Sequence, residues 1–148
     1  MQNSDAMALS ATLLAVAGDL TRRIHDGVLA RGFEGVRPAH GFAFTRLAAG
    51  GATVTDLAAH LGVTKQAASQ LVDEIVRKGY ARRRAHPEDA RARLVELTER
   101  GRACTRAAEE VAGEVVGEWA GVLGAAEVRA LGAALARIAP QGPIRPTW

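Results

Sequence analysis

Two short helices joined by a glycine turn, and followed at once by a basic hairpin, constrain the fold of this chain more than any other part of its sequence. Thr53 and Asp56 have the spacing of a capping box, which marks the start of a short helix. Gly62 supplies the turn, and Thr64 is a suitable N-cap for a second helix over residues 65–78. This order of elements predicts a helix-turn-helix.

The segment after the second helix predicts a positively charged hairpin. Residues 80–84 and 93–97 predict two short strands, and residues 85–92 predict their connection, with His-Pro-Glu-Asp at its centre. Eight basic and four acidic residues lie between positions 64 and 93, whereas four basic and seven acidic residues lie between positions 94 and 135. The positive charge is therefore local, and a local basic patch attracts a polyanion such as a nucleic acid.

Amphipathic helices are predicted on both sides of this segment. Apolar residues recur at spacings of three and four over residues 8–31, and a second helix begins at Pro38. Thr98 is the expected N-cap of a long helix, and a last helix follows Gly124. The first seven residues are polar and are expected to fray, and three prolines keep the C-terminal tail from forming a helix.

Together these elements predict a mainly α fold with a minor β component, a winged helix-turn-helix with flanking helices and a two-stranded wing. We expect a single domain over residues 1–148. Within it, residues 36–97 form the winged helix-turn-helix lobe, residues 8–32 and 98–139 form the flanking helices, and residues 140–148 form an irregular tail. A chain of 148 residues is long enough to bury one hydrophobic core.

The outward face of the second helix carries side chains suited to reading DNA. Gln66 and Gln70 each offer a hydrogen-bond donor and an acceptor, which recognition of base edges in the major groove requires, and Ser69 is short enough for close approach. Lys65, at the start of the helix, suits a phosphate. A solvated helix face would have a similar composition, but the basic hairpin directly after it favours the DNA-binding interpretation.

At this point the chain resembles the MarR family of bacterial winged-helix regulators. The resemblance rests on TVTDLAAHLGVTKQAASQLVD at residues 53–73 and on RRRAHPEDARARLVELT at residues 82–98. The second run is similar to the family's wing signature, Asp-x-Arg followed by an apolar strand, with Asp89 and Arg91 at the signature positions. Ala90 stands where the family often has a second arginine.

The resemblance implies more than the residues alone do. It implies a sequence-specific transcriptional regulator, generally a repressor, that binds a pseudo-palindromic site as a homodimer formed by the flanking helices. The second helix of each subunit would enter a major groove, and the wings would enter the flanking minor grooves. It also implies a pocket for a small organic effector between the dimerisation helices and the DNA-binding lobe.

The expected site residues follow from both lines of reasoning. Arg91 is expected in the minor groove, oriented by a charge-assisted hydrogen bond that its guanidinium donates to Asp89. The expected DNA-binding residues are Thr64, Lys65, Gln66, Ser69, Gln70, Arg77, Arg84, Asp89, Arg91 and Arg93. The expected effector-binding residues are His25, His40, Phe42 and Phe44.

Other functions have less support in the sequence. No catalytic residue, metal ligand or cofactor is predicted: there is no glycine-rich phosphate loop or nucleophile elbow, and the four histidines do not have the spacing of metal ligands. Two alternatives stay open, a winged-helix module that binds protein rather than DNA, and a metal-responsive regulator. Gly113, Gly117 and Gly121 recur on one face of the long helix, either at a dimer seam or as tolerated small residues.

The expected compartment is the cytoplasm. A single cysteine, Cys104, excludes a disulfide within the chain, and we expect it to be a structural residue rather than a peroxide sensor. No apolar run reaches the length of about 20 residues that a membrane span requires, and the N-terminus has no secretion signal. The expected partners are duplex DNA, a second copy of the chain and a small-molecule effector, with no membrane.

Overall fold

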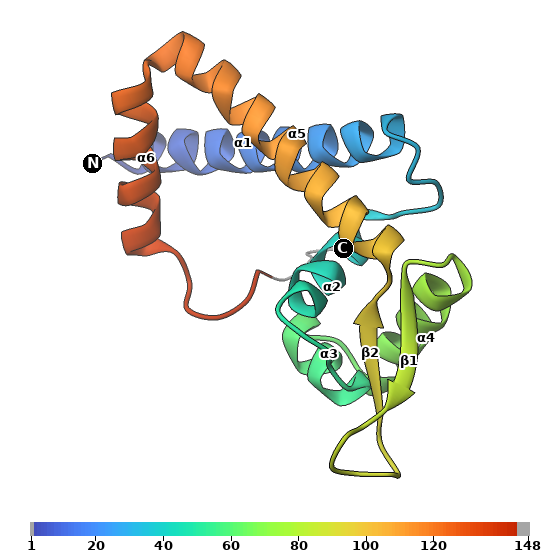
Figure 1. Cartoon of the computed structure of the whole chain (residues 1–148). Helices are drawn as coiled ribbons and strands as arrows, with labels where there is room; N and C mark the ends of the chain where they lie inside the picture. Colours follow the sequence, from blue (N-terminus) through green and yellow to red (C-terminus); the bar gives the residue numbers. More distant parts are fainter. Residues whose placement is uncertain (1, 145–148) are drawn as a thin grey trace.

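Six helices and one two-stranded sheet make up residues 2–144, the part of the chain that this computed structural model describes (Figure 1). In chain order they are α1 (Asn3–Ala30), α2 (Pro38–Ala48), α3 (Val54–Leu61), α4 (Lys65–Arg77), β1 (Ala81–Ala85), β2 (Arg93–Leu97), α5 (Glu99–Leu123) and α6 (Ala125–Ile138). The expected fold class is confirmed, because a helix-turn-helix and a two-stranded wing lie between long helices.

The lobe from α2 to β2 holds the main hydrophobic core. β1 and β2 pair antiparallel, from Ala81 opposite Leu97 to Ala85 opposite Arg93, and Ala52 adds an isolated bridge to Val95. Most of the fully buried side chains lie in this lobe; the largest of them are Tyr80, Leu57, Ile75, His40, Val72 and Val95. The core therefore fixes α3, α4 and the wing relative to one another.

The long helices pack against each other through few buried residues. Val28 of α1 and Val111 and Val115 of α5 are buried. At Gly27 a Cβ atom would lie 2.7 Å from the Val111 side chain, so this glycine permits the close approach of α1 to α5. Figure 1 shows α5 crossing α1 and then turning sharply into α6, which has no buried residue.

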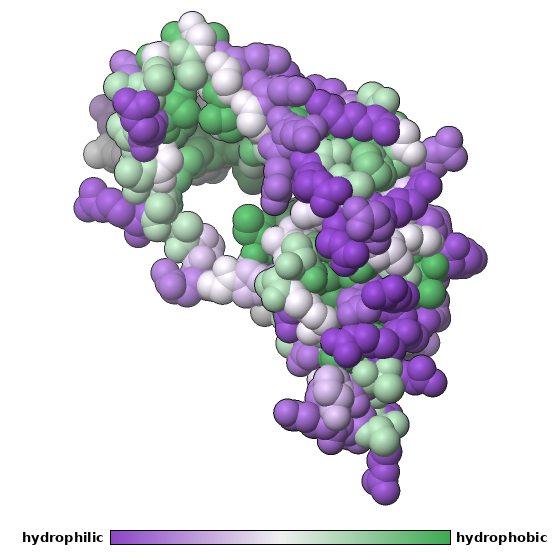
Figure 2. Space-filling view, in the orientation of Figure 1, coloured by the Kyte–Doolittle hydropathy of each residue, from purple (hydrophilic) through white to green (hydrophobic). Residues whose placement is uncertain are grey.

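Much of the predicted apolar face of these helices is exposed in the single chain. Figure 2 shows apolar side chains gathered over the α1 and α6 end of the molecule, around the opening between α6 and the lobe. The large exposed apolar residues of α1, α5 and α6 are Met7, Leu9, Leu13, Leu14, Val16, Leu29, Val122, Leu123, Leu131, Leu135 and Ile138. No part of the described chain buries them.

Several element boundaries differ from those expected. α1 begins at Asn3, so residues 3–7 are helical rather than frayed as expected, and Met1 lies outside the described part. Asp5 lies in the first turn, where an acidic side chain favours a helix. α4 ends one residue earlier than expected, and β1 is shifted one residue towards the wing. The expected irregular tail is non-helical through residue 144, and its last four residues lie outside the described part.

Within residues 2–144 no single helix combines the length and apolar character needed to cross a membrane. Only α5 and α6 taken together meet that requirement, and the two are bent by 115° at their junction.

Candidate nucleic-acid interface and the adjoining cavity

α3 begins with the predicted capping box. The Asp56 amide donates to Thr53 Oγ1 at 3.1 Å, and the Thr53 amide donates to the Asp56 carboxylate at 3.0 Å. The hydrogen bond from the Thr53 amide is the main reason that the pKa of the Asp56 carboxyl lies below its usual value. Gly62 ends the helix in the left-handed conformation, with φ of 67°, and so turns the chain into α4.

α4 presents a polar face because its apolar face is buried in the lobe. The Ala67 amide donates to Thr64 Oγ1 at 3.1 Å, which confirms Thr64 as the N-cap. Ala68, Val72 and Ile75 are buried, as expected from their spacing. The opposite face leaves Lys65, Gln66, Gln70 and Arg77 exposed, with Ser69 half-buried beside them.

The wing is positively charged, but three of its arginines are engaged by acidic residues. Arg82 and Arg84 each donate to Glu96 at 2.7 Å, and these two guanidinium groups lower the pKa of the Glu96 carboxyl. Arg83 pairs with Asp73 of α4 and so ties the wing to that helix.

The cations that remain for a polyanion lie on α4 and near the wing tip. Among the ion pairs of residues 2–144, none involves the side chains of Lys65, Arg77, Arg91 or Arg93. All four side chains are on exposed residues. All four belong to the winged helix-turn-helix lobe.

Asp89 shapes the wing turn in a different way from the one expected. Its carboxylate accepts a hydrogen bond from the Arg91 backbone amide at 3.0 Å, rather than from the Arg91 guanidinium. This is the local side-chain-to-backbone bond that aspartate favours in turns. Asp89 therefore fixes the backbone from which Arg91 extends and leaves the guanidinium available.

A cavity of about 570 Å³ lies between the lobe and the long helices. Its walls come from α1, α2 and α5 and include three of the four expected effector-binding residues, His25, Phe42 and Phe44. The other lining residues are Thr21, Ile24, Val28, Val36, Arg37, Pro38, Gly41, Thr45, Ala48, Cys104, Thr105, Ala108, Glu109, Ala112 and Ile144. Most of these side chains are apolar, as is usual for a small-molecule site.

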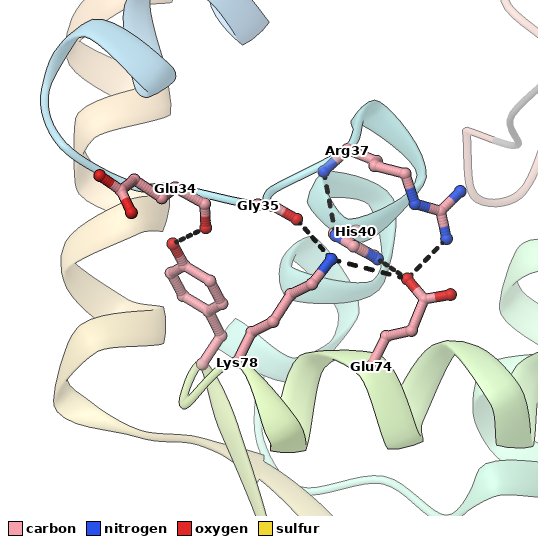
Figure 3. A network of polar contacts seen from close by, with 7 residues as sticks. Glu34, Gly35, Arg37, His40, Glu74 and Lys78 are labelled. Carbon is pink, nitrogen blue, oxygen red and sulfur yellow. Dashed lines mark hydrogen bonds and ion pairs between the residues drawn. The ribbon is translucent and has the colours of Figure 1, made fainter.

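His40 does not line this cavity, which differs from the expectation for it. The ring is fully buried, with Nδ1 accepting from the Arg37 amide at 3.0 Å and Nε2 lying 3.0 Å from the Glu74 carboxylate (Figure 3). Burial is the main reason that its pKa lies below the usual value of histidine. Because Nδ1 accepts a hydrogen bond from an amide, the geometry fits a neutral ring with its proton on Nε2.

Glu74 joins the start of α2 to α4. Besides His40, its carboxylate accepts from Arg37 Nη2 at 2.8 Å and lies 3.9 Å from Lys78 Nζ, as Figure 3 shows. The hydrogen bond from Arg37 is the main reason that the pKa of Glu74 is lowered. Neither Arg37 nor Glu74 was among the expected site residues, because only the fold brings them together.

Cys104 is buried in the wall of the same cavity. Burial raises the pKa of its thiol to about 11, although the positive charge of Arg100 acts in the opposite direction. The direction of this shift fits a structural cysteine and opposes the activation that nearby arginines and a helix N-terminus could have produced.

Taken together, a short capped helix, a polar second helix and a basic wing define a winged helix-turn-helix protein. The MarR family model matches residues 35–92, which cover α2, α3, α4, β1 and the wing turn. The chain is 26% identical to a MarR family transcription regulator, with 91% of each chain covered and a TM-score of 0.72. The resemblance to the MarR family is therefore confirmed.

Two further solved structures have the same fold. One is a MarR family protein from Bacillus stearothermophilus, with 19% identity, coverage of 93% of this chain and 95% of that one, and a TM-score of 0.78. The other is a mutant of MepR from S. aureus bound to an oligodeoxyribonucleotide, with 20% identity, coverage of 88% and 94%, and a TM-score of 0.65. No curated protein sequence matches the chain.

Proposed function

We propose that this chain is a transcriptional regulator that binds a pseudo-palindromic site in duplex DNA as a homodimer, acts as a repressor in the cytoplasm and is released by a small organic effector. The observation that carries the proposal is the exposed face of α4, where Lys65, Gln66 and Gln70 lie in the same lobe as the free arginines of the wing. The oligonucleotide bound to the MepR mutant, on a similar fold, supports the same function.

Each part of this face has a separate role in the proposal. Gln66, Ser69 and Gln70 read base edges in the major groove, and Lys65 holds a phosphate. Arg91 enters the minor groove beside it, where a narrow A·T-rich tract has an enhanced negative potential. Thr64, Arg77, Arg84, Asp89 and Arg93 complete the interface as phosphate contacts or as supports of the wing.

The exposed apolar residues of α1 and α6 support the homodimer. Leu14 and Ile138 are 75% and 74% exposed in the single chain. Soluble monomers rarely expose large contiguous apolar surfaces, so a second copy is the expected cover. Gly113, Gly117 and Gly121 of α5 are open to solvent in the single chain. They can therefore either lie at a dimer seam or be tolerated small residues. Two-fold symmetry would place the half-sites about 10 base pairs apart.

The test begins with selection of bound sequences from random duplex DNA, followed by fluorescence anisotropy over a range of salt concentrations. Gln70→Ala should weaken discrimination at one base pair by about 1–3 kcal/mol. Lys65→Ala should weaken binding to all DNA sequences alike and lower the salt dependence of that binding. Gln141→Ala removes the same type of side chain from the tail and should leave binding unchanged.

Three results would each overturn a part of the proposal. A chain that binds duplex DNA weakly and without sequence preference would favour the protein-binding module instead. Full affinity from a species that light scattering shows to be a monomer would refute the symmetric dimer. If Gln66 and Gln70 can both become alanine with unchanged preference, then α4 is not the recognition helix.

A further inference from the structure

The contacts around Glu74 connect the large cavity to the recognition helix. Arg37 is the first residue before α2 and lines the cavity, and its guanidinium reaches across to Glu74 on α4. A smaller cavity of about 160 Å³ is lined by both members of this ion pair and by Gln70, among others. Of the described residues, Arg37 alone lines both cavities.

The ion pair between Arg37 and Glu74 can exchange for another one. The Arg37 side chain is 55% exposed and the Glu74 side chain 30% exposed. Exposed ion pairs of this kind add little net stability, since water competes for both charges. A carboxylate held in a partly desolvated cavity would offer the guanidinium a comparable or better bidentate partner.

We propose that Arg37 is the residue through which a ligand in the large cavity acts on α4: an organic anion takes the guanidinium away from Glu74. The apolar body of such a ligand would pack against Ile24, Phe42 and Phe44, and its carboxylate would point to Arg37. This inference rests on the proposed function, because it specifies how effector release of DNA occurs.

Loss of Arg37 changes α4 in two ways. Glu74 then keeps the His40 ring and Lys78, whose Nζ is 3.9 Å away, so one of the links between α2 and α4 is broken. The Glu74 carboxylate also loses its closest cation, one helical turn from Gln70 along α4. A less neutralised carboxylate there repels phosphate, so the anion-bound protein binds DNA more weakly.

The first test measures ligand binding by calorimetry with two probes of the same shape, 2-naphthoate and neutral 2-naphthamide. Arg37→Met should weaken naphthoate binding about 10-fold and leave naphthamide binding unchanged, because only the charge-assisted contact is lost. Glu74→Gln should strengthen naphthoate binding, since it removes the competitor for Arg37. Arg46→Met removes an arginine of α2 that lies outside the cavity and should change neither.

Naphthoate affinity should fall in Arg37→Met and rise in Glu74→Gln. A general loss of structure would instead lower the affinity of both variants. The second test follows amide hydrogen exchange of residues 65–77 and needs no DNA. Naphthoate should speed exchange in wild type but not in Arg37→Met, and naphthamide should not speed it in either.

These measurements distinguish this inference from the proposed function. A wild type that fails to bind DNA refutes the proposed function, yet the calorimetry and the exchange still decide the role of Arg37. Absence of naphthoate binding at millimolar concentration, equal binding of both probes, or weaker naphthoate binding to Glu74→Gln would each overturn the inference.

Discussion

Replacing Gly101 with alanine should destabilise the protein, although it removes a glycine from a long helix. Gly101 lies in the first turn of α5, and its amide donates to Thr98 Oγ1 at 3.2 Å. A Cβ atom at this position would lie 2.1 Å from the carbonyl oxygen of Tyr80, which also accepts the Thr98 amide at 3.0 Å. Because ordinary carbon–oxygen contacts are about 3.3 Å or longer, the backbone would have to separate by about 1.2 Å.

The magnitude follows from three opposing effects. Separation of the backbone weakens the hydrogen bond from Thr98 to Tyr80, at about 1 kcal/mol. Overpacking against the Tyr80 backbone and Leu97 adds about 2 kcal/mol. Helix propensity favours alanine over glycine by about 1 kcal/mol in the other direction. The free energy of unfolding should therefore fall by about 2 kcal/mol, and the melting temperature by about 4–8 °C.

Urea unfolding followed by circular dichroism measures this difference, with the protein concentration held constant because the stability of the proposed dimer would depend on it. Gly41→Ala is the matched control, since Gly41 lies inside α2 with nothing within 4 Å of a Cβ atom. That variant should be more stable by up to about 1 kcal/mol. Equal or greater stability of Gly101→Ala relative to wild type would refute the close approach of α5 to the start of the wing.

Three further expectations concern pH, DNA and the thiol. The lowered pKa of His40 means that the unfolded chain takes up a proton at higher pH, so stability is complete above about pH 6.5 and falls as the pH is lowered through that value. His40→Gln can keep the hydrogen bond from the Arg37 amide. This variant should lose less stability than wild type between about pH 7 and 5 in urea unfolding. An equal loss of stability in the two proteins would show that His40 is not the cause of the pH dependence. Arg91→Ala should reduce DNA affinity and lower the slope of log K against log salt by about 1, whereas an unchanged slope would remove Arg91 from the interface. Cys104, with its pKa raised to about 11, should react with iodoacetamide about 100-fold more slowly at pH 8 than a free cysteine, and rapid alkylation of the folded protein would show that the thiol is open to solvent.

Local signals in the sequence predicted the helix-turn-helix well. The capping box at Thr53 and the N-cap at Thr64 depend on residues three positions apart, and both are present as expected. The left-handed turn at Gly62 likewise depends on one residue. Such features are set by the chain's immediate neighbours, so they can be inferred before the fold is known.

Contacts between distant residues could not be predicted in the same way. Glu74 is 37 residues from Arg37 and 34 from His40, and nothing in the spacing of these three residues indicates that they meet. The sequence suggested His40 as an effector ligand because it falls near the crevice that the family resemblance implies. In the fold its ring points into the lobe and supports the start of α2, a role that requires knowledge of where α4 lies.

The apolar faces of α1 and α6 show a different limit. Leu131, Leu135 and Ile138 recur with helical spacing, and the sequence correctly predicted a helix with one apolar face. Periodicity reports which side of a helix avoids water, but it does not report which surface covers that side. In this chain α1 and α5 leave α6 without a buried residue, so contacts within residues 2–144 do not bury its apolar side. That is the physical reason that the same residues which define the fold also support a second copy as partner.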